Sequence, residues 1–421
     1  MIHQELSLAP HLSVMENIAL GVEPARLGVI DRARIRQTAV DALQQLGHPE
    51  ISPASCVADL SPAGQQLVEI ARALATGARV LVFDEPTSSL SRPDVQKLFN
   101  LIARLKQRGL GIVYISHFIE EVKQVSDRFV VLRDGQNAGG GTTAEARGDE
   151  IVSLMVGRPL DDLYPRSSRT MGEPLLEVSD LVFAGAGSAR FTLHRGEIFG
   201  VAGLLGAGRT RLLRALFGLE AVRSGAVRLG AYAGPAPPAA RWRQGMGMLS
   251  EDRTGEGLAL KLNIADNMTL TCLEGMGPGF VVLPARQNAA ARRWMDSLGI
   301  RASGPRQAVR HLSGGNQQKV ALARLLHHGV DVLLLDEPTR GIDVASKAQI
   351  YALIDELVCG QDRSGANSRA VLLVSSYFPE LLGVCDRIAV MSRGSLGPAR
   401  PASEWTEHAL LMEASGARAA P

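Results

Sequence analysis

The sequence predicts two tandem α/β domains, each built around a largely parallel sheet. Residues 60–74 (LSPAGQQLVEIARAL) recur as 312–326 (LSGGNQQKVALARLL). The segment VLVFDEPT at 80–87 recurs as VLLLDEPT at 332–339, with the same offset of 252 residues. Apolar runs that are short enough for buried strands alternate with helical patterns, which favours parallel sheets. These runs lie at 80–83, 112–115, 198–202, 332–335 and 371–374.

The length of the repeat indicates duplicated domains, because solenoid repeats have periods of about 20–50 residues. A stretch rich in Pro, Gly, Ser and Arg separates the two copies and is typical of a linker. The expected organisation is a first domain at 1–157, a linker at 158–174, a second domain at 175–398 and a C-terminal helix and tail at 399–421.

Composition excludes several classes of protein. Hydrophobic residues make up 46% of the 421 residues and charged residues 21%, as in ordinary soluble globular domains. A net charge of +2 gives no electrostatic reason to expect a nucleic-acid partner. Four scattered cysteines favour a reducing compartment. Since no apolar run approaches the roughly 20 residues that cross a bilayer, any membrane role is expected to run through a partner, from the cytoplasmic side.

A glycine-rich segment of the form G-x-x-x-x-G-R-T follows the apolar run at 198–202 and precedes a helical pattern at 210–217. Such loops turn backbone N–H groups toward phosphates at a helix N-terminus. Thr210 would supply a hydroxyl to Mg²⁺. Arg209 stands where the motif normally has lysine, and its planar guanidinium changes the geometry. The alternative is a turn that packs a helix on a strand. The candidate phosphate-binding residues are Gly203, Leu204, Leu205, Gly206, Ala207, Gly208, Arg209 and Thr210.

Two acidic pairs follow matched apolar strands. Asp84 and Asp336 would lie at the C-terminal edge of each sheet, where parallel sheets bind ligands, and are candidate Mg²⁺ ligands. Glu85 and Glu337 come next and could polarise an attacking water. A strand-ending acidic turn closed by the following proline is the alternative, but recurrence at a matched distance argues against it.

Two further candidates belong to the first copy. His117 follows the strand at 111–116 and could contact a terminal phosphate, although a histidine after a strand is often structural. The corresponding stretch of the second copy places Ser376 there. Gln4 is a candidate link between phosphate sensing and a helical subdomain, and its alternative is a solvated side chain. The second copy has Ser-Glu-Asp at 250–252 instead.

These motifs together resemble ATP-binding-cassette ATPases. The duplicated arrangement is similar to the fused ATP-binding subunit of bacterial monosaccharide importers of the ribose, galactose and xylose type. That resemblance implies two tandem P-loop NTPase domains of the ABC type, each with a sheet core and a helical subdomain. The segments that narrow it are LSGGNQQ, DEPTRGID, GLLGAGRT, SEDRTGEGL and EIVSLMVGRPLDDLYP.

In the family that this chain resembles, two cassettes dock head to tail and each ATP lies between one glycine loop and the other signature. Carried over, one site combines the first cassette with the second signature. Its residues are Asp84, Glu85, His117, Gln4, Ser313, Gly314, Gly315 and Asp343. The other site combines residues 203–210, Asp336 and Glu337 with Ser61 of the weaker signature S-P-A-G. It carries Arg209, Glu251 and Ser376, so we expect it to hydrolyse ATP poorly.

The first copy shows no glycine loop, so the first domain is expected to be N-terminally incomplete and poorly stable. We therefore expect binding of ATP and Mg²⁺ with little turnover. The resemblance also implies a permease pair as partner, a periplasmic sugar-binding protein acting indirectly, and a peripheral position on the cytoplasmic face of the inner membrane. A non-hydrolytic degenerate or regulatory fragment is the main alternative. A twin-cassette ribosome factor is disfavoured by the short bridge, and the residues do not name the sugar.

Overall fold

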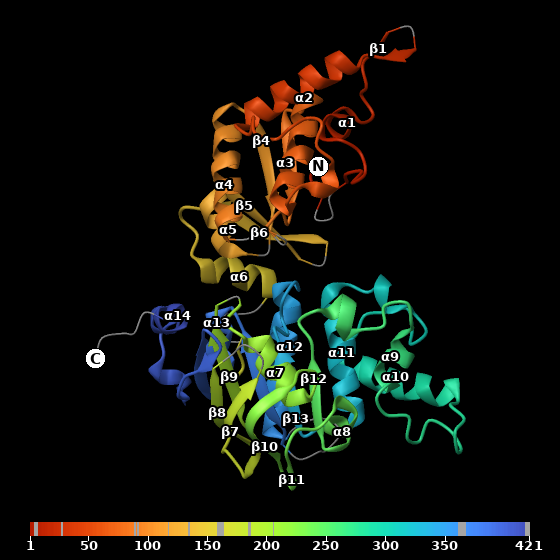
Figure 1. Cartoon of the computed structure of the whole chain (residues 1–421), viewed down its shortest axis with the longest axis vertical. Helices are drawn as coiled ribbons and strands as arrows, with labels where there is room; N and C mark the ends of the chain where they lie inside the picture. The colour runs from red at the N-terminus through yellow and green to blue at the C-terminus, as the bar shows by residue number, and fades with distance from the viewer. Residues whose placement is uncertain are drawn as a thin grey trace. The chain divides into compact units, whose positions relative to one another are not determined.

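The computed structural model describes residues 1–3, 7–26, 28–87, 90, 92–116, 118–133, 135–157, 164–183, 187–204, 206–360 and 368–416. The chain divides into two compact units, Met1–Gly157 and Arg158–Pro421. Each unit combines strands with covering helices (Figure 1).

The described residues of the first unit form three small pairs of strands and a group of helices. β3 (Val80–Asp84) pairs in parallel with β4 (Gly111–Ile115), and Ile2 forms a parallel bridge to Phe83 on the other side of β3. β5 (Arg128–Arg133) pairs antiparallel with β6 (Gln136–Thr142), and β1 (Ala25–Arg26) with β2 (Val29–Ile30). The helices are α1 (Val14–Ala19), α2 (Arg32–Leu46), α3 (Pro62–Ala75), α4 (Arg92–Gln107), α5 (Ile119–Val125) and α6 (Gly148–Val156).

Local signals explain where these helices begin and end. Ser13 and Glu16 form a capping box at the start of α1. Asp31 caps α2, which ends at Gly47 in the left-handed conformation. The apolar faces of α1 to α4 bury a core against β3 that includes Leu43, Leu81, Phe83 and Leu101.

The second unit contains two sheets. The central sheet has the order β12-β13-β14-β9-β15-β16, and its first five strands run parallel. The strands of this sheet are β12 (Met246–Leu249), β13 (Val332–Asp336), β14 (Ala370–Ser375), β9 (Ile198–Gly203), β15 (Arg387–Ser392) and β16 (Ser395–Leu396), with β17 (Arg400–Pro401) pairing to β15. An antiparallel sheet has the order β11-β10-β7-β8. It comprises β7 (Pro174–Phe183), β8 (Ser188–His194), β10 (Val222–Leu229) and β11 (Tyr232–Ala233).

Helices cover the central sheet of the second unit. Strands β9, β13 and β14 are buried at every position, as expected for a parallel sheet covered on both faces. One core cluster contains Leu333 and Leu335, and the other contains Leu334 and Leu372. The helices are α7 (Arg209–Phe217), α8 (Pro238–Arg243), α9 (Ile264–Thr269), α10 (Pro284–Leu298), α11 (Gly314–His328), α12 (Val344–Cys359), α13 (Phe378–Val384) and α14 (Glu407–Ser415).

The structure reproduces the sequence repeat in several pairs of elements. Helices α3 and α11, strands β3 and β13, and helices α4 and α12 begin 252 residues apart, while α5 and α13 begin 259 apart. The prediction of two tandem α/β domains with parallel sheet cores is confirmed. The antiparallel sheet β11-β10-β7-β8 was not predicted. Among the described residues, none of the helices is long and apolar enough to cross a membrane.

The described part of the segment at 158–174 is tied to the second unit. Arg169 forms ion pairs with Asp355 at 2.5 Å and with Asp386 at 3.0 Å, and its side chain is only 7% exposed. Ser167 donates its backbone N–H and its hydroxyl to Asp355. The chain is therefore anchored to α12 and to the start of β15 before β7 begins.

Candidate functional site

The glycine loop joins β9 to α7 at the C-terminal edge of the central sheet. Gly206 and Gly208 have φ of 80° and 105°, a region that favours glycine. A Cβ at Gly203 would lie 2.6 Å from the carbonyl oxygen of Met391, so the backbone approaches β15 too closely for a side chain. Leu204 and Ala207 are described, whereas Leu205 lies outside the described residues.

The N-terminus of α7 is open for an anion. Gly208 is its N-cap and offers no side-chain acceptor to the first N–H groups of the helix. Those donors and the helix dipole point toward the loop, which is the arrangement that binds phosphate. The loop can therefore hold a phosphate chain through its backbone.

Asp336 ends β13 beside this loop. Its side chain is buried, and neither carboxylate oxygen has a hydrogen-bond partner of normal geometry within the described residues. Burial raises the pKa of Asp336 to about 6, and the nearby Thr210 hydroxyl and Arg209 guanidinium oppose that shift. A buried carboxylate with two unused oxygens next to a hydroxyl matches the hard oxygen ligands of Mg²⁺. Asp336 and Thr210 therefore fit the predicted metal site.

Glu337 is held in a strained and enclosed position. Its φ of 46° lies in the left-handed region, and its backbone N–H donates to the Val374 carbonyl at 2.9 Å. One carboxylate oxygen accepts the Ser376 backbone N–H at 2.7 Å and lies 3.2 Å from Arg209 Nη1. Burial raises the pKa of Glu337, and Arg209 opposes the rise. The ion pair with Arg209 makes this carboxylate a weaker proton acceptor than burial alone would make it.

The sequence interpretation missed the pairing of Arg209 with Glu337, and it also missed two arginines near the signature. Arg253 donates to the carbonyl of Gly314 at 3.3 Å, and Arg340 forms an ion pair with Glu251. Both arginines lie inside the motifs SEDRTGEGL and DEPTRGID, which is the signal that could have identified them.

The second signature is packed against the start of α12. Ser313 is the N-cap of α11, and a Cβ at Gly315 would lie 2.3 Å from the hydroxyl oxygen of Ser346. Asp343 caps α12 by accepting the Ser346 backbone N–H at 2.9 Å. The structure thus brings Ser313, Gly314, Gly315 and Asp343 together as one group, in which Ser313 and Asp343 are exposed and Gly315 is buried.

The first unit repeats the acidic turn. Asp84 ends β3, and Glu85 has a φ of 44° with its N–H donating to Ile115 at 2.9 Å, as in the second unit. Ser61 is the N-cap of α3 and accepts the Gly64 N–H at 3.2 Å. Gln4 and His117 lie outside the described residues.

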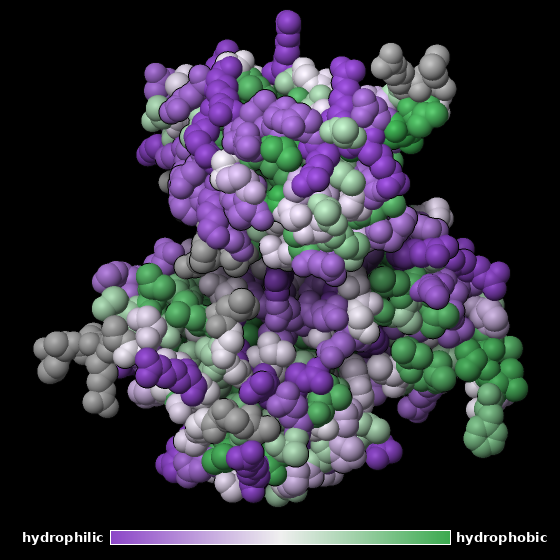
Figure 2. Space-filling view, turned by 45° about the horizontal axis from the view of Figure 1, so that its top comes forward, coloured by the Kyte–Doolittle hydropathy of each residue, from purple (hydrophilic) through white to green (hydrophobic). Residues whose placement is uncertain are grey.

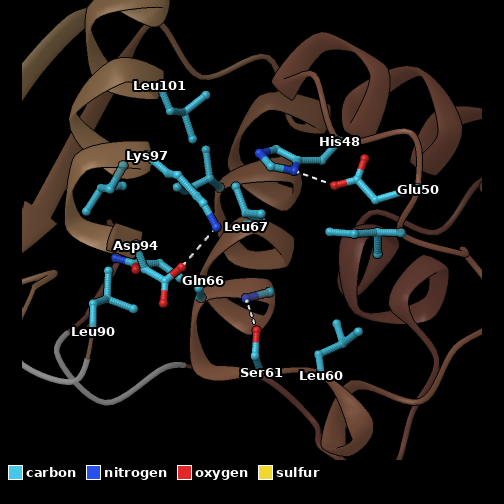
Figure 3. A pocket seen from close by; sticks show the side chains of 15 residues that line it. His48, Glu50, Leu60, Ser61, Gln66, Leu67, Leu90, Asp94, Lys97 and Leu101 are labelled. Carbon is cyan, nitrogen blue, oxygen red and sulfur yellow. Dashed lines mark hydrogen bonds and ion pairs between the residues drawn. The ribbon is translucent and has the colours of Figure 1, made fainter. Parts of the chain in front are cut away.

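A cavity of about 260 Å³ borders Ser61 within the first unit (Figure 3). Its charged lining residues are already paired, His48 with Glu50 at 2.7 Å and Lys97 with Asp94 at 3.3 Å. Much of the remaining lining is apolar. A mostly apolar lining with paired charges does not suit a phosphate chain. The residues of the acidic turn at Asp84 are not among those that line the cavity.

Comparison with known proteins decides the family. The ABC transporter family model matches residues 1–88 and 187–340, which include the glycine loop and both acidic turns. The chain belongs to the ABC transporter family. It is 43% identical to a ribose import ATP-binding protein of Rubrobacter xylanophilus, over 100% of this chain and 83% of that protein. A ribose import ATP-binding protein of Streptomyces avermitilis is 42% identical over 97% of this chain and 77% of that protein.

These relatives confirm the resemblance to fused twin-cassette ABC proteins, and with it the assignment to the ABC-type ATPases. A solved nucleotide-free cassette of an ABC transporter is 16% identical over 54% of this chain and 92% of that chain, with a TM-score of 0.45. That likeness is too weak to add to the assignment.

Proposed function

We propose that this ABC protein is the ATP-binding subunit that energises import of a monosaccharide through a partner permease. The observation that carries the proposal is the buried carboxylate of Asp336, whose oxygens have no hydrogen-bond partner in the described residues. It lies beside the glycine loop, and helix α7 after this loop has no side-chain cap at its N-terminus. The names of the relatives, which concern ribose import, support a sugar as the transported substrate.

Residues 203–210 bind the phosphates of ATP, chiefly through backbone N–H groups. Thr210 and Asp336 hold Mg²⁺, which neutralises phosphate charge when bound. In the first cassette, Asp84 takes the metal-binding role and Glu85 and His117 the catalytic roles, with Gln4 near the terminal phosphate. Ser61, Ser313, Gly314, Gly315 and Asp343 complete the proposed nucleotide-binding residues.

Hydrolysis at the second cassette is slow in this proposal. Arg209 lies 3.2 Å from Glu337, so the carboxylate that would accept a proton from water is already paired with a cation. The glycine loop of the second unit therefore serves mainly to hold nucleotide, and Glu85 is the proposed base of the first cassette.

The proposed permease contacts lie on the segments that follow Gln4 in the first cassette and Glu251 in the second. Leu20 and Val22 are 38% and 53% exposed in the first unit, and Leu262 and Leu270 are 43% and 55% exposed in the second. Figure 2 shows apolar surface near the α9–α10 connection, toward the right of the view. In this proposal the protein sits on the cytoplasmic face of the inner membrane, with a periplasmic sugar-binding protein acting indirectly and no nucleic-acid partner.

Calorimetric titration of the full chain with ATP tests the nucleotide site. We expect binding that is strengthened by Mg²⁺, and loss of the Mg²⁺ effect in Asp336→Asn and Thr210→Val. The exposed carboxylate variant Asp296→Asn is the matched control and should bind as the wild type does. Binding that ignores Mg²⁺, or no binding at all, would contradict the proposal.

Import is tested separately in the host organism. Deleting the gene should abolish uptake of radiolabelled ribose or a related monosaccharide, and the wild-type gene should restore it. Restoration by an Asp84→Asn, Asp336→Asn double variant would show that the proposed sites are not what drives uptake.

A further inference from the structure

Each unit contains a side-chain bracket that joins the acidic turn to the end of the next strand. In the second unit, Thr339 Oγ1 donates to Glu380 Oε1 at 2.8 Å, and Ser375 Oγ donates to Glu380 Oε2 at 2.5 Å. Glu380 lies on α13 and is 1% exposed. We call these three residues the threonine–glutamate–serine bracket of the second unit. The proposed function assigns no role to any of them.

The first unit has the same bracket with the same pattern of donors. Thr87 Oγ1 donates to Glu121 Oε1 at 2.7 Å, and Ser116 Oγ donates to Glu121 Oε2 at 2.9 Å. The two brackets recur although neighbouring positions differ between the copies, such as His117 in the first and Ser376 in the second.

A tyrosine hydroxyl accompanies both brackets but comes from different elements. In the first unit, Tyr114 on β4 donates to Glu121 Oε2 at 2.7 Å. The matching strand position in the second unit is a leucine. There Tyr351 of α12 lies 3.5 Å from the Thr339 hydroxyl, and its hydroxyl also interacts with Glu380. The position of Tyr351 in α12 corresponds to Phe99 in α4 of the first unit. The tyrosine hydroxyl near the glutamate therefore comes from a strand in the first unit and from a helix in the second.

The bracket holds a turn that is strained. Glu85 and Glu337 have φ of 44° and 46°, and non-glycine residues stay in this region only where surrounding contacts enforce it. Thr87 and Thr339 follow these glutamates by two residues. Hydrogen bonds from the threonines to a carboxylate on the following helix provide such enforcement, and this carboxylate is buried in the second unit and partly buried in the first.

The bracket also reaches the phosphate-facing groups. Ser375 Oγ lies 3.5 Å from Glu337 Oε2, and the next residue, Ser376, donates its backbone N–H to Glu337 at 2.7 Å. A displacement of Ser375 therefore moves the Ser376 backbone and the Glu337 carboxylate, which is paired with Arg209 of the glycine loop.

We propose that Glu380, and Glu121 in the first unit, are positioning residues that fix the acidic turn and the following strand end so that the site distinguishes ATP from ADP. This inference rests on the proposed function, because it requires the glycine loop at 203–210 to bind nucleotide. The bracket touches no nucleotide itself. It acts through Glu337 and the Ser376 backbone, which lie toward the terminal phosphate.

The test compares Mg·ATP and Mg·ADP affinities of the full chain by calorimetric titration. Thr339→Val removes one hydroxyl at nearly constant volume, and Ser375→Ala removes the other. We expect each variant to lose about tenfold in ATP affinity, equivalent to the loss of one or two hydrogen bonds, while ADP affinity stays within about twofold. Thr339→Ser keeps the hydroxyl and should restore the preference for ATP.

Thr269→Val is the matched control, since Thr269 is a fully buried threonine of α9 with a hydrogen bond of 2.9 Å to Ala265. It should change the melting temperature about as much as Thr339→Val and leave both affinities unchanged. Equal losses of ATP and ADP affinity in the bracket variants, or no loss, would overturn the inference. If Thr339→Val does not fold, Ser375→Ala decides alone. A wild-type chain that binds neither nucleotide would overturn the proposed function as well.

Discussion

At the residue scale, the second unit concentrates buried acids around its glycine loop. Asp336, Glu337 and Glu380 are each 9% exposed or less, and burial raises the pKa of all three. Arg209 approaches Glu337 but leaves both oxygens of Asp336 without a partner. Burying an unpaired carboxylate is unfavourable in the absence of a cation. The unpaired carboxylate of Asp336 therefore lowers the stability of the folded state, and a bound metal ion would restore it.

This imbalance predicts how Asp336→Asn changes the pH dependence of stability. The folded pKa of about 6 lies above the reference value of 3.8, so between these values the folded state binds more protons than the unfolded state. Wild-type stability then falls as pH rises through this window and stays lower above it. Relative to the variant, we expect a fall of up to about 3 kcal/mol. Urea unfolding from pH 4 to pH 7.5 measures it.

Asp296→Asn removes an exposed carboxylate and controls for the change in net charge. Added Mg·ATP should stabilise the wild type more than Asp336→Asn. Parallel stability curves for wild type and Asp336→Asn over this pH range would contradict the prediction.

The candidate site residues come from the sequence, but the contacts that their side chains make could not be predicted from it. The glycine loop, Asp336 and Glu337 follow from local motifs and their spacing. The contact between Arg209 and Glu337 joins residues that are far apart in the chain, and it depends on how α7 lies beside β13. Glu380 looks like an ordinary helix-surface glutamate in the sequence. Only the fold shows it buried beneath Thr339 and Ser375.

At the element scale, the two copies differ in how their strands are paired. β14 has partners on both sides, β13 and β9, whereas the described residues of the first unit pair β4 with β3 alone. Val113 on β4 and Leu132 on β5 are 49% and 74% exposed. Exposed apolar side chains on edge strands favour association between molecules.

We therefore expect Val113→Thr together with Leu132→Thr to slow aggregation of the full chain at 37 °C. The melting temperature should change little because both side chains are exposed and threonine keeps the strand propensity. Light scattering over time measures the effect. Leu81→Thr is the matched control, since Leu81 is buried in β3 and its replacement should destabilise the first unit and speed aggregation. Unchanged scattering in the double variant would show that these strands are not the associating surface.

The same comparison shows which elements the sequence could predict. Apolar runs identified β9, β13 and β14 because strands buried on both faces read as continuous hydrophobic segments. The same kind of run identified β3 and β4, although the structure leaves several of their positions exposed. The sheet β11-β10-β7-β8 was not predicted because its strands mix exposed and buried positions, as β10 does, and because its strand pairing has register shifts. Alternating, irregular strands give a weak local signal, and their partners are set by tertiary contacts.

At the scale of the whole molecule, the cores of the two units are separate. One cluster of buried apolar residues lies within the first unit, and two others lie within the second. In the second unit, the buried guanidinium of Arg169 forms ion pairs with Asp355 and Asp386 and so anchors the segment that precedes β7. Since no buried cluster extends across both units among the described residues, each unit should unfold as its own cooperative block.

Calorimetry of the full chain should accordingly show two unfolding transitions. Arg169→Met leaves two carboxylates without their cation, which costs about 3–5 kcal/mol for a buried pair, and lowers only the second unit's transition by roughly 10 °C. Arg190→Met is the matched control: its pair with Asp180 is 73% and 61% exposed, so it should shift that transition by no more than about 2 °C. Leu81→Ala should lower only the other transition, through the cavity it leaves in the first unit's core. A single transition that all three variants shift together would mean that the units unfold as one, and that the anchor at Arg169 stabilises the whole chain rather than its second half.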